Sequence, residues 1–560
     1  MRYLITCSLL IITLYPYIMT KLYQSLCFIA LVFIARAGFA QQIKVSAEVK
    51  QAMDKVSANQ IKADITYLAD DKLKGRAPGT EGYRMAVDYV VDQLIALNVK
   101  PVGEKDTWLQ TVRFKRVFSN DAVMTVDASA TELKRGADFT ISPNPATAKV
   151  NISAPLVFAG YGISEPKLGY DDYAGLDVKG KIVVIVRGAP DNFSSSVSAH
   201  TMNAAAILKA ASDHGAVGVL VGSVDSGVGR GGGGGNRGVY NIVDDKGNVV
   251  VSRTYYGSIN VYGTVGYQFF NGLVQKQGKS LQTILAQLKA GKPNSFSLNT
   301  GVKVAYTSTY QDIISYNVVG KVEGTDRKLK NQYVVHSAHL DHLGIGRPVE
   351  GDSIYNGAHD NASGVASVLA IAKIYHDIKI KPKRSIIFIL MTGEELGDMG
   401  SSYFAKHPTI PVGSMVADVN TDMPTIIAPL LSITALGAEH SSLAKQVAQA
   451  AGYLNLGVED DPEPKQARFT RSDQYSFVVN GIPALHVKYG SKTADGKNNM
   501  NDLVAPWRAK YYHKPQDDIN GIFDFEAGKK YAQLNFLIGY LVAQGVARPT
   551  WNAGDIFADN

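Results

Sequence analysis

The chain has 560 residues, of which 46% are hydrophobic and 19% charged, so it is long enough to form two or three globular domains. Its formal net charge is +7, and residues 1–40 contribute three basic and no acidic residues to that value. The charge is modest, and no Lys/Arg-rich block with interleaved aromatics is present. These features argue against a nucleic-acid-binding protein.

Residues 1–40 are predicted to be a signal peptide. From Met19 onward the sequence has a basic start at Lys21, an apolar core and a small-residue end, which favours cleavage before Gln41. The extra apolar stretch 3–18 leaves two alternatives open, a start at Met19 or an uncleaved anchor. No other run is long and apolar enough to span a bilayer. We therefore expect an exported protein, periplasmic or secreted, or anchored if this segment is retained.

The positions of the cysteines exclude several kinds of site. Cys7 and Cys27 both lie within the predicted signal peptide, so the rest of the chain has no cysteine. Disulfide scaffolds, cysteine-based zinc sites and cysteine proteases are thereby excluded.

Residues 41–150 are predicted to begin the main domain. Apolar residues at spacings of three and four predict helices within 44–100, and the Gly- and Pro-rich segment LKGRAPGTEG between them predicts a loop. From residue 107 to residue 140 the spacing between apolar residues becomes shorter, which predicts strands.

Residues 151–302 are predicted to be a separate, inserted domain. The runs APLVFAGYGI, GKIVVIVRG and GAVGVLVGS are typical of strands, and Asn203–His214 predicts a helix between the last two. Gly227, Gly229 and Gly232 fit the dinucleotide pattern G-x-G-x-x-G. However, no strand leads into them and no helix follows, so we interpret this run as a surface loop.

Residues 303–545 return to alternating strands and helices, followed by a C-terminal tail, 546–560. This alternation predicts a mixed, mostly parallel α/β sheet with helices on both faces, and sites in such folds gather at the carboxyl ends of strands. The predicted strands are 332–337, 384–391, 412–420, 430–436 and 484–489, and the predicted helices are 363–378, 439–451 and 528–543.

Three polar clusters follow apolar runs between His339 and Glu395. His339 and Asp341 are two residues apart, so the carboxylate can orient an imidazole that binds metal. His336 and His342 compete for that role, although His336 falls inside a strand, where a packed imidazole is expected. Asp360 precedes an apolar helix that Asn361 or Ser363 would cap, which leaves its carboxylate free to bridge two metals.

The third cluster has two adjacent carboxylates, Glu394 and Glu395. They repel each other unless a cation or a shared proton compensates, so one can bind metal while the other holds the attacking water. Asp422 and His513 are two further candidate ligands. Three ligand carboxylates and one ionised base balance two divalent ions, so the set predicts two Zn²⁺ ions.

The motifs H-x-D, D-N-A-S-G, E-E-x-G, N-x-D-M and Y-H-x-P-x-D, in this order, resemble the M28 family of zinc peptidases, mostly aminopeptidases. That resemblance covers roughly residues 60–150 and 303–545. The intervening segment, with GYGI and YDDYAGLDVKGKIVVIVRG, resembles a protease-associated (PA) domain.

The resemblance implies a role for each site residue. One zinc would be held by His339 and Asp422 and the other by Glu395 and His513. Asp360 would bridge the two ions, Glu394 would be the general base, and Asp341 would orient His339. The segment RFTRSDQYSF resembles a stretch that lines the substrate pocket, which suggests oxyanion stabilisation by Tyr475. Gln474 stands there where the family usually has His, which leaves a polar role of position 474 in doubt.

The expected function is that of an exported di-zinc peptidase, with a peptide or protein substrate, that releases N-terminal residues through a metal-bridging hydroxide. A carboxypeptidase or dipeptidase on the same scaffold stays open, because Arg468 and Arg471 could bind a substrate carboxylate. A one-zinc acyltransferase similar to glutaminyl cyclase and a non-enzymatic peptide-binding or receptor-like protein are the further alternatives. No G-x-S-x-G motif supports a serine hydrolase.

Overall fold

The computed structural model describes residues 43–127, 131–225 and 238–558. The chain divides into two compact units, Met1–Lys50 and Gln51–Asn560, and all that follows concerns the second. The predicted signal peptide and the glycine run 227–232 lie outside the described residues. Among the helices that the structure describes, none is both long and apolar enough to cross a membrane.

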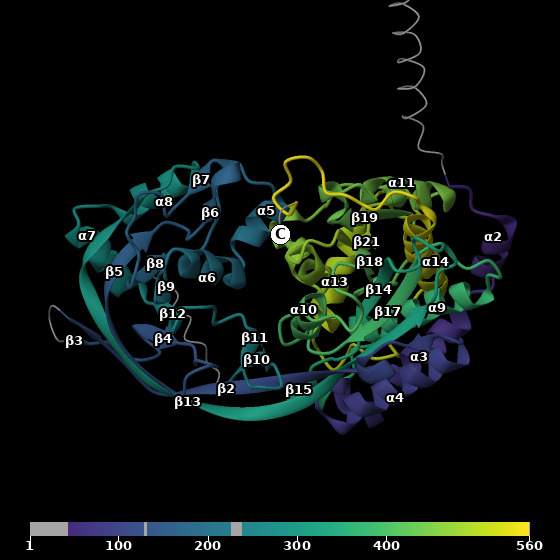
Figure 1. The fold of residues 1–560 in the computed structure, drawn as a ribbon, viewed down its shortest axis with the longest axis horizontal. Helices are drawn as coiled ribbons and strands as arrows, with labels where there is room; N and C mark the ends of the chain where they lie inside the picture. The colour runs from purple at the N-terminus through teal and green to yellow at the C-terminus, as the bar shows by residue number, and fades with distance from the viewer. Residues whose placement is uncertain (1–42, 128–130, 226–237, 559–560) are drawn as a thin grey trace, which may run out of the picture. The chain divides into compact units, whose positions relative to one another are not determined.

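The second half of the chain forms a mixed, mostly parallel layer (Figure 1). β14 runs parallel to β17 and β18, and β18 runs parallel to β21, whereas β13 and β19 are antiparallel to their neighbours. The layer follows the order β1 (Lys100–Pro101), β13 (Ser295–Val322), β17 (Ser385–Met391), β14 (Tyr333–His339), β18 (Met415–Asn420), β21 (Ala484–Tyr489), β19 (Ser432–Leu436) and β20 (Gly457–Val458).

Helices cover both faces of this layer. Side chains alternate between the faces of a strand, so neighbours in β14 point to opposite sides. His336 faces Tyr375 of α9 (Ser363–Asp377) and the long helix α14 (Phe525–Gln544). Val335 packs in a cluster with Phe404 of α10 (Met399–Lys406) and Phe477 of α12 (Gln474–Val478). The predicted α/β fold class is confirmed.

The inserted segment has its own small sheet and core. Strands β5 (Lys149–Ala159), β8 (Ile182–Ile185), β9 (Gly218–Gly222) and β12 (Val261–Val265) are parallel, and β4 (Phe139–Ile141) pairs antiparallel with β12. Asn203, at the start of the predicted helix, caps α6 (Ala204–Asp213) through its side chain. The sheet buries apolar side chains against α7 (Tyr267–Lys276) and α8 (Leu281–Lys289).

A long antiparallel ribbon joins the two sheets. β2 (Leu109–Val126) pairs with β13 between residues 302 and 318, and the two ends of β13 pair with β5 and with β17 (Figure 1). The boundary predicted at 302–303 therefore falls inside one continuous strand. A hairpin of β10 (Val239–Val243) and β11 (Val249–Val251) is attached to the edge of β2.

Helices α3 (Ala58–Leu68) and α11 (Leu443–Tyr453) pack against α14. Helix α2 (Ala47–Asp54) spans the boundary between the two units. The remaining elements are α4 (Glu81–Ala96), β3 (Thr131–Glu132), β6 (Ser164–Glu165), β7 (Tyr170–Asp171), α5 (Ser195–Thr201), β15 (Gly344–Val349), β16 (Asp352–Tyr355) and α13 (Met500–Tyr511).

Candidate metal centre

The candidate site lies at the carboxyl ends of the parallel strands, as expected for an open α/β sheet. His339 is the last residue of β14, and Glu394 and Glu395 lie in the turn that follows β17. Asp422 follows β18 by two residues. Asp360 lies just before α9, and His513 lies just after α13. The sheet therefore brings together residues that are far apart in the sequence.

The five predicted ligands form one cluster centred on Asp360. The Nε2 atom of His339 lies 3.3 Å from Oδ1 of Asp360 and 3.5 Å from Oδ1 of Asp422. The Nε2 atom of His513 lies 3.1 Å from Oδ2 of Asp360 and 3.3 Å from Oε2 of Glu395. Each oxygen of Asp360 thus faces a different imidazole, and each imidazole has a second carboxylate beside it.

The side chains present fit metal ions. Among the described residues, the buried atoms Nε2 of His339, Oδ1 of Asp422 and Oε1 of Glu395 have no hydrogen-bond partner. Buried carboxylates packed together need a compensating positive charge. Two groups of side chains offer ligand atoms that lie within 4.8 Å of one another: His339, Glu394 and Asp422, and His342, Asp360 and Glu395. The chemistry of these donors suits two borderline cations such as zinc.

His342, which competes with His339 for the ligand role on sequence grounds, enters the second of these groups. Its Nδ1 atom lies 2.7 Å from Oε1 of Glu395, and its ring meets the ring of His513 edge to face. The group around Glu395 therefore has two candidate imidazole ligands, His342 and His513. The H-x-D-H spacing is visible in the sequence, but the approach of His342 to Glu395 and His513 depends on contacts between residues distant in sequence.

Asp341 supports two neighbours at once. Its backbone carbonyl lies 3.2 Å from Nδ1 of His339, and its side-chain Oδ1 lies 4.0 Å from the same atom. The same carboxylate accepts a hydrogen bond of 3.2 Å from the backbone N–H of Glu394. Burial raises the pKa of Asp341 to about 6. Asp341 thus helps to hold both the imidazole and the turn that carries the predicted base.

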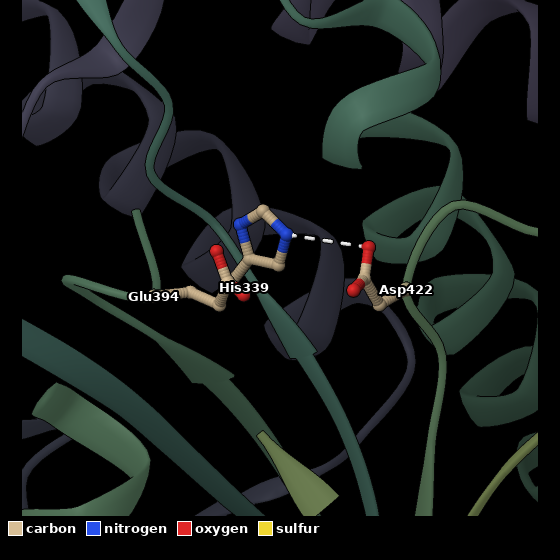
Figure 2. A group of neighbouring side chains, drawn as sticks. All are labelled: His339, Glu394 and Asp422. Carbon is tan, nitrogen blue, oxygen red and sulfur yellow. Dashed lines mark ion pairs between the residues drawn. The ribbon is translucent and has the colours of Figure 1, made fainter. Parts of the chain in front are cut away.

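Glu394 lies beside the ring of His339, with Asp422 on the other side of that ring (Figure 2). Burial raises the pKa of Glu394 well above its ordinary value, and the nearby charges of Asp398 and Glu395 act in the same direction. A carboxylate with a raised pKa is a better proton acceptor, which is the property that a general base requires.

The charge of Asp360 is stabilised by its neighbours. Burial alone would raise its pKa, but contacts with His339 and His513 hold that pKa well below the ordinary value. Asp517 fixes the backbone, since its two carboxylate oxygens accept hydrogen bonds from the backbone N–H groups of His359 (2.9 Å) and Asp360 (3.0 Å). Asp517 is the last residue of the motif Y-H-x-P-x-D, to which sequence analysis assigned no role.

Arg76, in the loop predicted between two helices, links the two loops that carry His339 and Asp360. Its guanidinium is buried and donates to the carbonyls of Leu340 (3.0 Å) and Gly357 (3.1 Å), as well as to Leu68 and Asn356. Burial lowers its pKa to about 10. No local pattern in LKGRAPGTEG indicates this contact, because its partners lie far along the chain.

The loop that carries Asp422 is fixed in a similar way from β21. Lys488 is buried and donates from Nζ to the carbonyls of Asp422 (2.8 Å) and Met423 (3.0 Å). The Nε2 atom of His486 lies 2.7 Å from the same carbonyl of Asp422. Asn361 then links this loop to the start of α9, because its side chain contacts Thr421, Met423 and Gly364.

A cavity of about 220 Å³ opens over the candidate ligands. Besides four of the predicted ligands and Glu394, it is lined by Arg471, Tyr512, Asp398 and Arg253. The substrate role of Arg471 stays a prediction. Arg253 comes from the inserted segment, and sequence analysis gave it no role.

Tyr475 lies in a different place. Its hydroxyl is 2.7 Å from Nδ1 of His200, and it lines a neighbouring cavity of about 460 Å³. This position gives no support to the oxyanion role implied by the resemblance. Tyr512, which stacks on His513, is the tyrosine that lines the metal cavity.

His336 has the packing role expected for a histidine within a strand. Its ring stacks on Phe388 and lies near Tyr375, away from the ligand cluster. Burial lowers its pKa to about 3, so the ring is neutral at ordinary pH.

Comparison with known proteins agrees with the motifs. Residues 317–534 match the model of peptidase family M28, and residues 152–256 match the PA domain. The resemblance inferred from the motifs is confirmed. In the structure, the β2–β13 ribbon joins these two segments.

Curated relatives and solved structures are also similar to the chain. Probable leucine aminopeptidase 2 of Aspergillus oryzae is 24% identical over 484 residues, which cover 84% of this chain and 80% of the relative. Carboxypeptidase Q of Rattus norvegicus is 27% identical over 217 residues, 36% of this chain and 42% of that relative. The solved aminopeptidase from Aneurinibacillus sp. strain AM-1 is 19% identical, with a TM-score of 0.46, over 89% of this chain and 96% of that one.

Proposed function

We propose that this protein is a di-zinc exopeptidase that releases N-terminal residues from peptides. The observation that carries the proposal is the arrangement around Asp360, whose two carboxylate oxygens face His339 and His513 at 3.3 and 3.1 Å. His339 and Asp422 would hold one ion. Glu395 and His513 would hold the other, with His342 as an additional candidate ligand. Asp360 would lie between the two ions.

The chemistry assigned to the chain's own residues follows from their positions. Zinc ions bound here would lower the pKa of water and polarise the scissile carbonyl. Glu394 accepts the proton of the attacking water and passes it to the leaving amine, as a base with a raised pKa can do. Asp341 keeps Glu394 and His339 in place through its contacts with both.

A carboxypeptidase or dipeptidase on the same scaffold is the second candidate. Arg471 favours it, because this exposed guanidinium lines the metal cavity and could bind the carboxylate at the end of a substrate. A relative named carboxypeptidase Q points in the same direction. A non-enzymatic binding protein is disfavoured by the complete set of five ligand side chains.

One assay panel tests the proposal. Purified protein is given aminoacyl-anilides with a free N-terminus, their N-acetylated forms, and N-blocked dipeptides, each with and without a chelator. We expect cleavage of the free aminoacyl-anilides alone, abolished by chelation and restored by zinc. Cleavage of the N-blocked dipeptides alone would refute the aminopeptidase proposal and support the carboxypeptidase alternative. Activity that is insensitive to chelation would refute the metal mechanism.

We also propose that the enzyme acts outside the cytoplasm, periplasmic or secreted, because of the signal-like residues 1–40. N-terminal sequencing of the protein recovered from its native host tests this proposal. A chain that begins at Gln41 supports export with cleavage, whereas a chain that keeps its N-terminal segment and is recovered from the cytoplasmic fraction would contradict export.

A further inference from the structure

Arg253 reaches the metal cavity from the inserted domain. It follows β11 in the hairpin attached to β2, and it lies within the segment that matches the PA domain. It lines the metal cavity together with Glu394 and Glu395, and also the larger neighbouring cavity of about 460 Å³. The inserted domain therefore contributes a positive charge to the cavity wall.

The position of Arg253 is set by a small apolar core. Val251, two residues earlier, and Ile242 of β10 pack against Phe114 of β2 and Met399 of α10. Met399 lies four residues after Glu395 and begins α10. The hairpin is thus held against the element that follows the catalytic turn, and this contact directs Arg253 toward the cavity.

The turn itself leaves room for the guanidinium. A Cβ atom added at Gly397 would stand 2.5 Å from Nη1 and 2.6 Å from Cδ of Arg253, so any side chain here would displace the arginine. Gly397 also has a φ of 106°, a conformation that glycine adopts with little strain. A glycine at this position therefore lets the guanidinium lie directly over the backbone beside Glu394 and Glu395.

The guanidinium has no hydrogen-bonding partner among the residues that the structure describes. Among the described residues, Arg253 makes no hydrogen bond or ion pair, and its side chain is exposed. Asp398 lines the same cavity and interacts electrostatically with Arg253, without a direct ion pair. A free guanidinium in a substrate cavity is suited to bidentate contact with a carboxylate.

We propose that Arg253 is a specificity-determining residue that binds a carboxylate of the peptide substrate within the metal cavity. This inference rests on the proposed peptidase function and adds the substrate class, peptides with a carboxylate close to the scissile bond. Three sources have this chemistry: the C-terminal carboxylate of a dipeptide, an acidic side chain of the second residue, and an acidic side chain of the first.

Matched substrate pairs distinguish these sources. Leu-Ala and Leu-Ala-amide differ in the C-terminal carboxylate, Leu-Asp-amide and Leu-Asn-amide in the second side chain, and Glu-anilide and Gln-anilide in the first. For the zinc-loaded full-length protein we expect kcat/KM to fall tenfold or more in Arg253→Gln for the charged member of one pair. The uncharged member of that pair should change less than twofold, and Arg253→Lys should be intermediate.

Arg187→Gln is the matched control, because Arg187 is an exposed arginine of the same inserted domain that does not line the cavity. Its kcat/KM values should equal those of the wild type. An equal fall for both members of every pair, or no fall in any pair, would overturn the proposal and leave Arg253 a structural partner of Asp398. Failure of the wild type to cleave any of these substrates would instead refute the proposed peptidase.

Discussion

Glu394 and Glu395 are adjacent in the chain but meet different surroundings. Oε2 of Glu395 lies 3.3 Å from His513 and its Oε1 lies 2.7 Å from His342, so this carboxylate belongs to the ligand cluster. Glu394 lies beside His339, and Asp341 holds its backbone N–H. The divergence of two neighbouring side chains at a turn supports the proposal that Glu395 binds metal and Glu394 transfers the proton.

The base role of Glu394 predicts a separation of activity from metal binding. Glu394→Gln removes the proton acceptor but keeps the size of the side chain, so we expect kcat to fall by about 10²- to 10⁴-fold. The zinc content, measured by mass spectrometry of the dialysed protein, should stay at two ions per chain. The same substitution at the exposed Glu526 of α14 serves as the control and should change neither quantity. A Glu394→Gln enzyme with a near-normal rate would remove Glu394 from the mechanism.

His336 predicts a dependence of stability on pH. Its pKa is lowered by burial to about 3, below the value of about 6.5 that a histidine has in an unfolded chain. Between these two values the unfolded state binds more protons, so the free energy of unfolding falls as the pH is lowered from 6.5 toward 3. His336→Leu should reduce this slope by up to one proton, roughly 1.4 kcal/mol per pH unit.

Urea unfolding between pH 4.5 and 7 measures that slope. His214→Leu is the control, because it removes a histidine from an exposed position of the inserted domain. An unchanged slope in His336→Leu would mean that His336 is protonated in the folded state.

At the scale of elements, the sequence predicts well those helices and strands whose bounds depend on local patterns of apolar residues. β21 has the predicted bounds, and α9 and β17 differ from prediction by one residue at one end, because their apolar runs end sharply at polar or Pro-flanked positions. The β2–β13 ribbon was not predicted, since its pairing joins residues nearly 200 positions apart and leaves no periodic signal. Arg76 and Arg253 were missed for the same reason, as their roles depend on contacts distant in sequence.

The C-terminal segment illustrates a further contact of this kind. Phe557 is fully buried in the core cluster that contains Phe469, Phe477 and Leu436, although the sequence suggested only a tail. His440 connects the same segment to α5, with Nδ1 2.7 Å from Asp555 and Nε2 2.9 Å from the hydroxyl of Ser196. Phe557 thus packs on the face of the sheet that α10 and α12 cover.

This packing predicts a large loss of stability on truncation of one side chain. Phe557→Ala should lower the free energy of unfolding by about 3–5 kcal/mol, the usual cost of a phenylalanine-sized cavity in a core. Val546→Ala is the control, because Val546 is 77% exposed, and it should change stability by less than about 0.5 kcal/mol. Denaturant unfolding followed by tryptophan fluorescence measures both, and equal stability of the two variants would contradict the packing of this segment.

At the scale of the whole molecule, the candidate ligands come from separate segments between His339 and His513, and part of their support comes from Arg76, far earlier in the chain. The sheet supplies His339, the two glutamates and Asp422, the start of α9 supplies Asp360, and the segment after α13 supplies His513. The residue types of the ligand set could be recognised from sequence because strand ends and metal-binding motifs are local. The support from Arg76, Asp517 and Lys488 could not, because it depends on how distant loops approach each other.

This assembly predicts that metal binding and folding stability are linked. Ions that bind only the folded state stabilise it by mass action, so chelation should lower the melting temperature and zinc should restore it. Activity should recover in proportion to added zinc and reach its maximum at two equivalents per chain. In Asp360→Asn the carboxylate that lies between the two proposed zinc positions is replaced by an amide, which is a weaker ligand. This variant should therefore lose bound zinc and activity together. Asp88→Asn, in an exposed ion pair on α4, is the control and should retain both. Saturation at one equivalent, or full zinc content in Asp360→Asn, would contradict a pair of ions centred on Asp360.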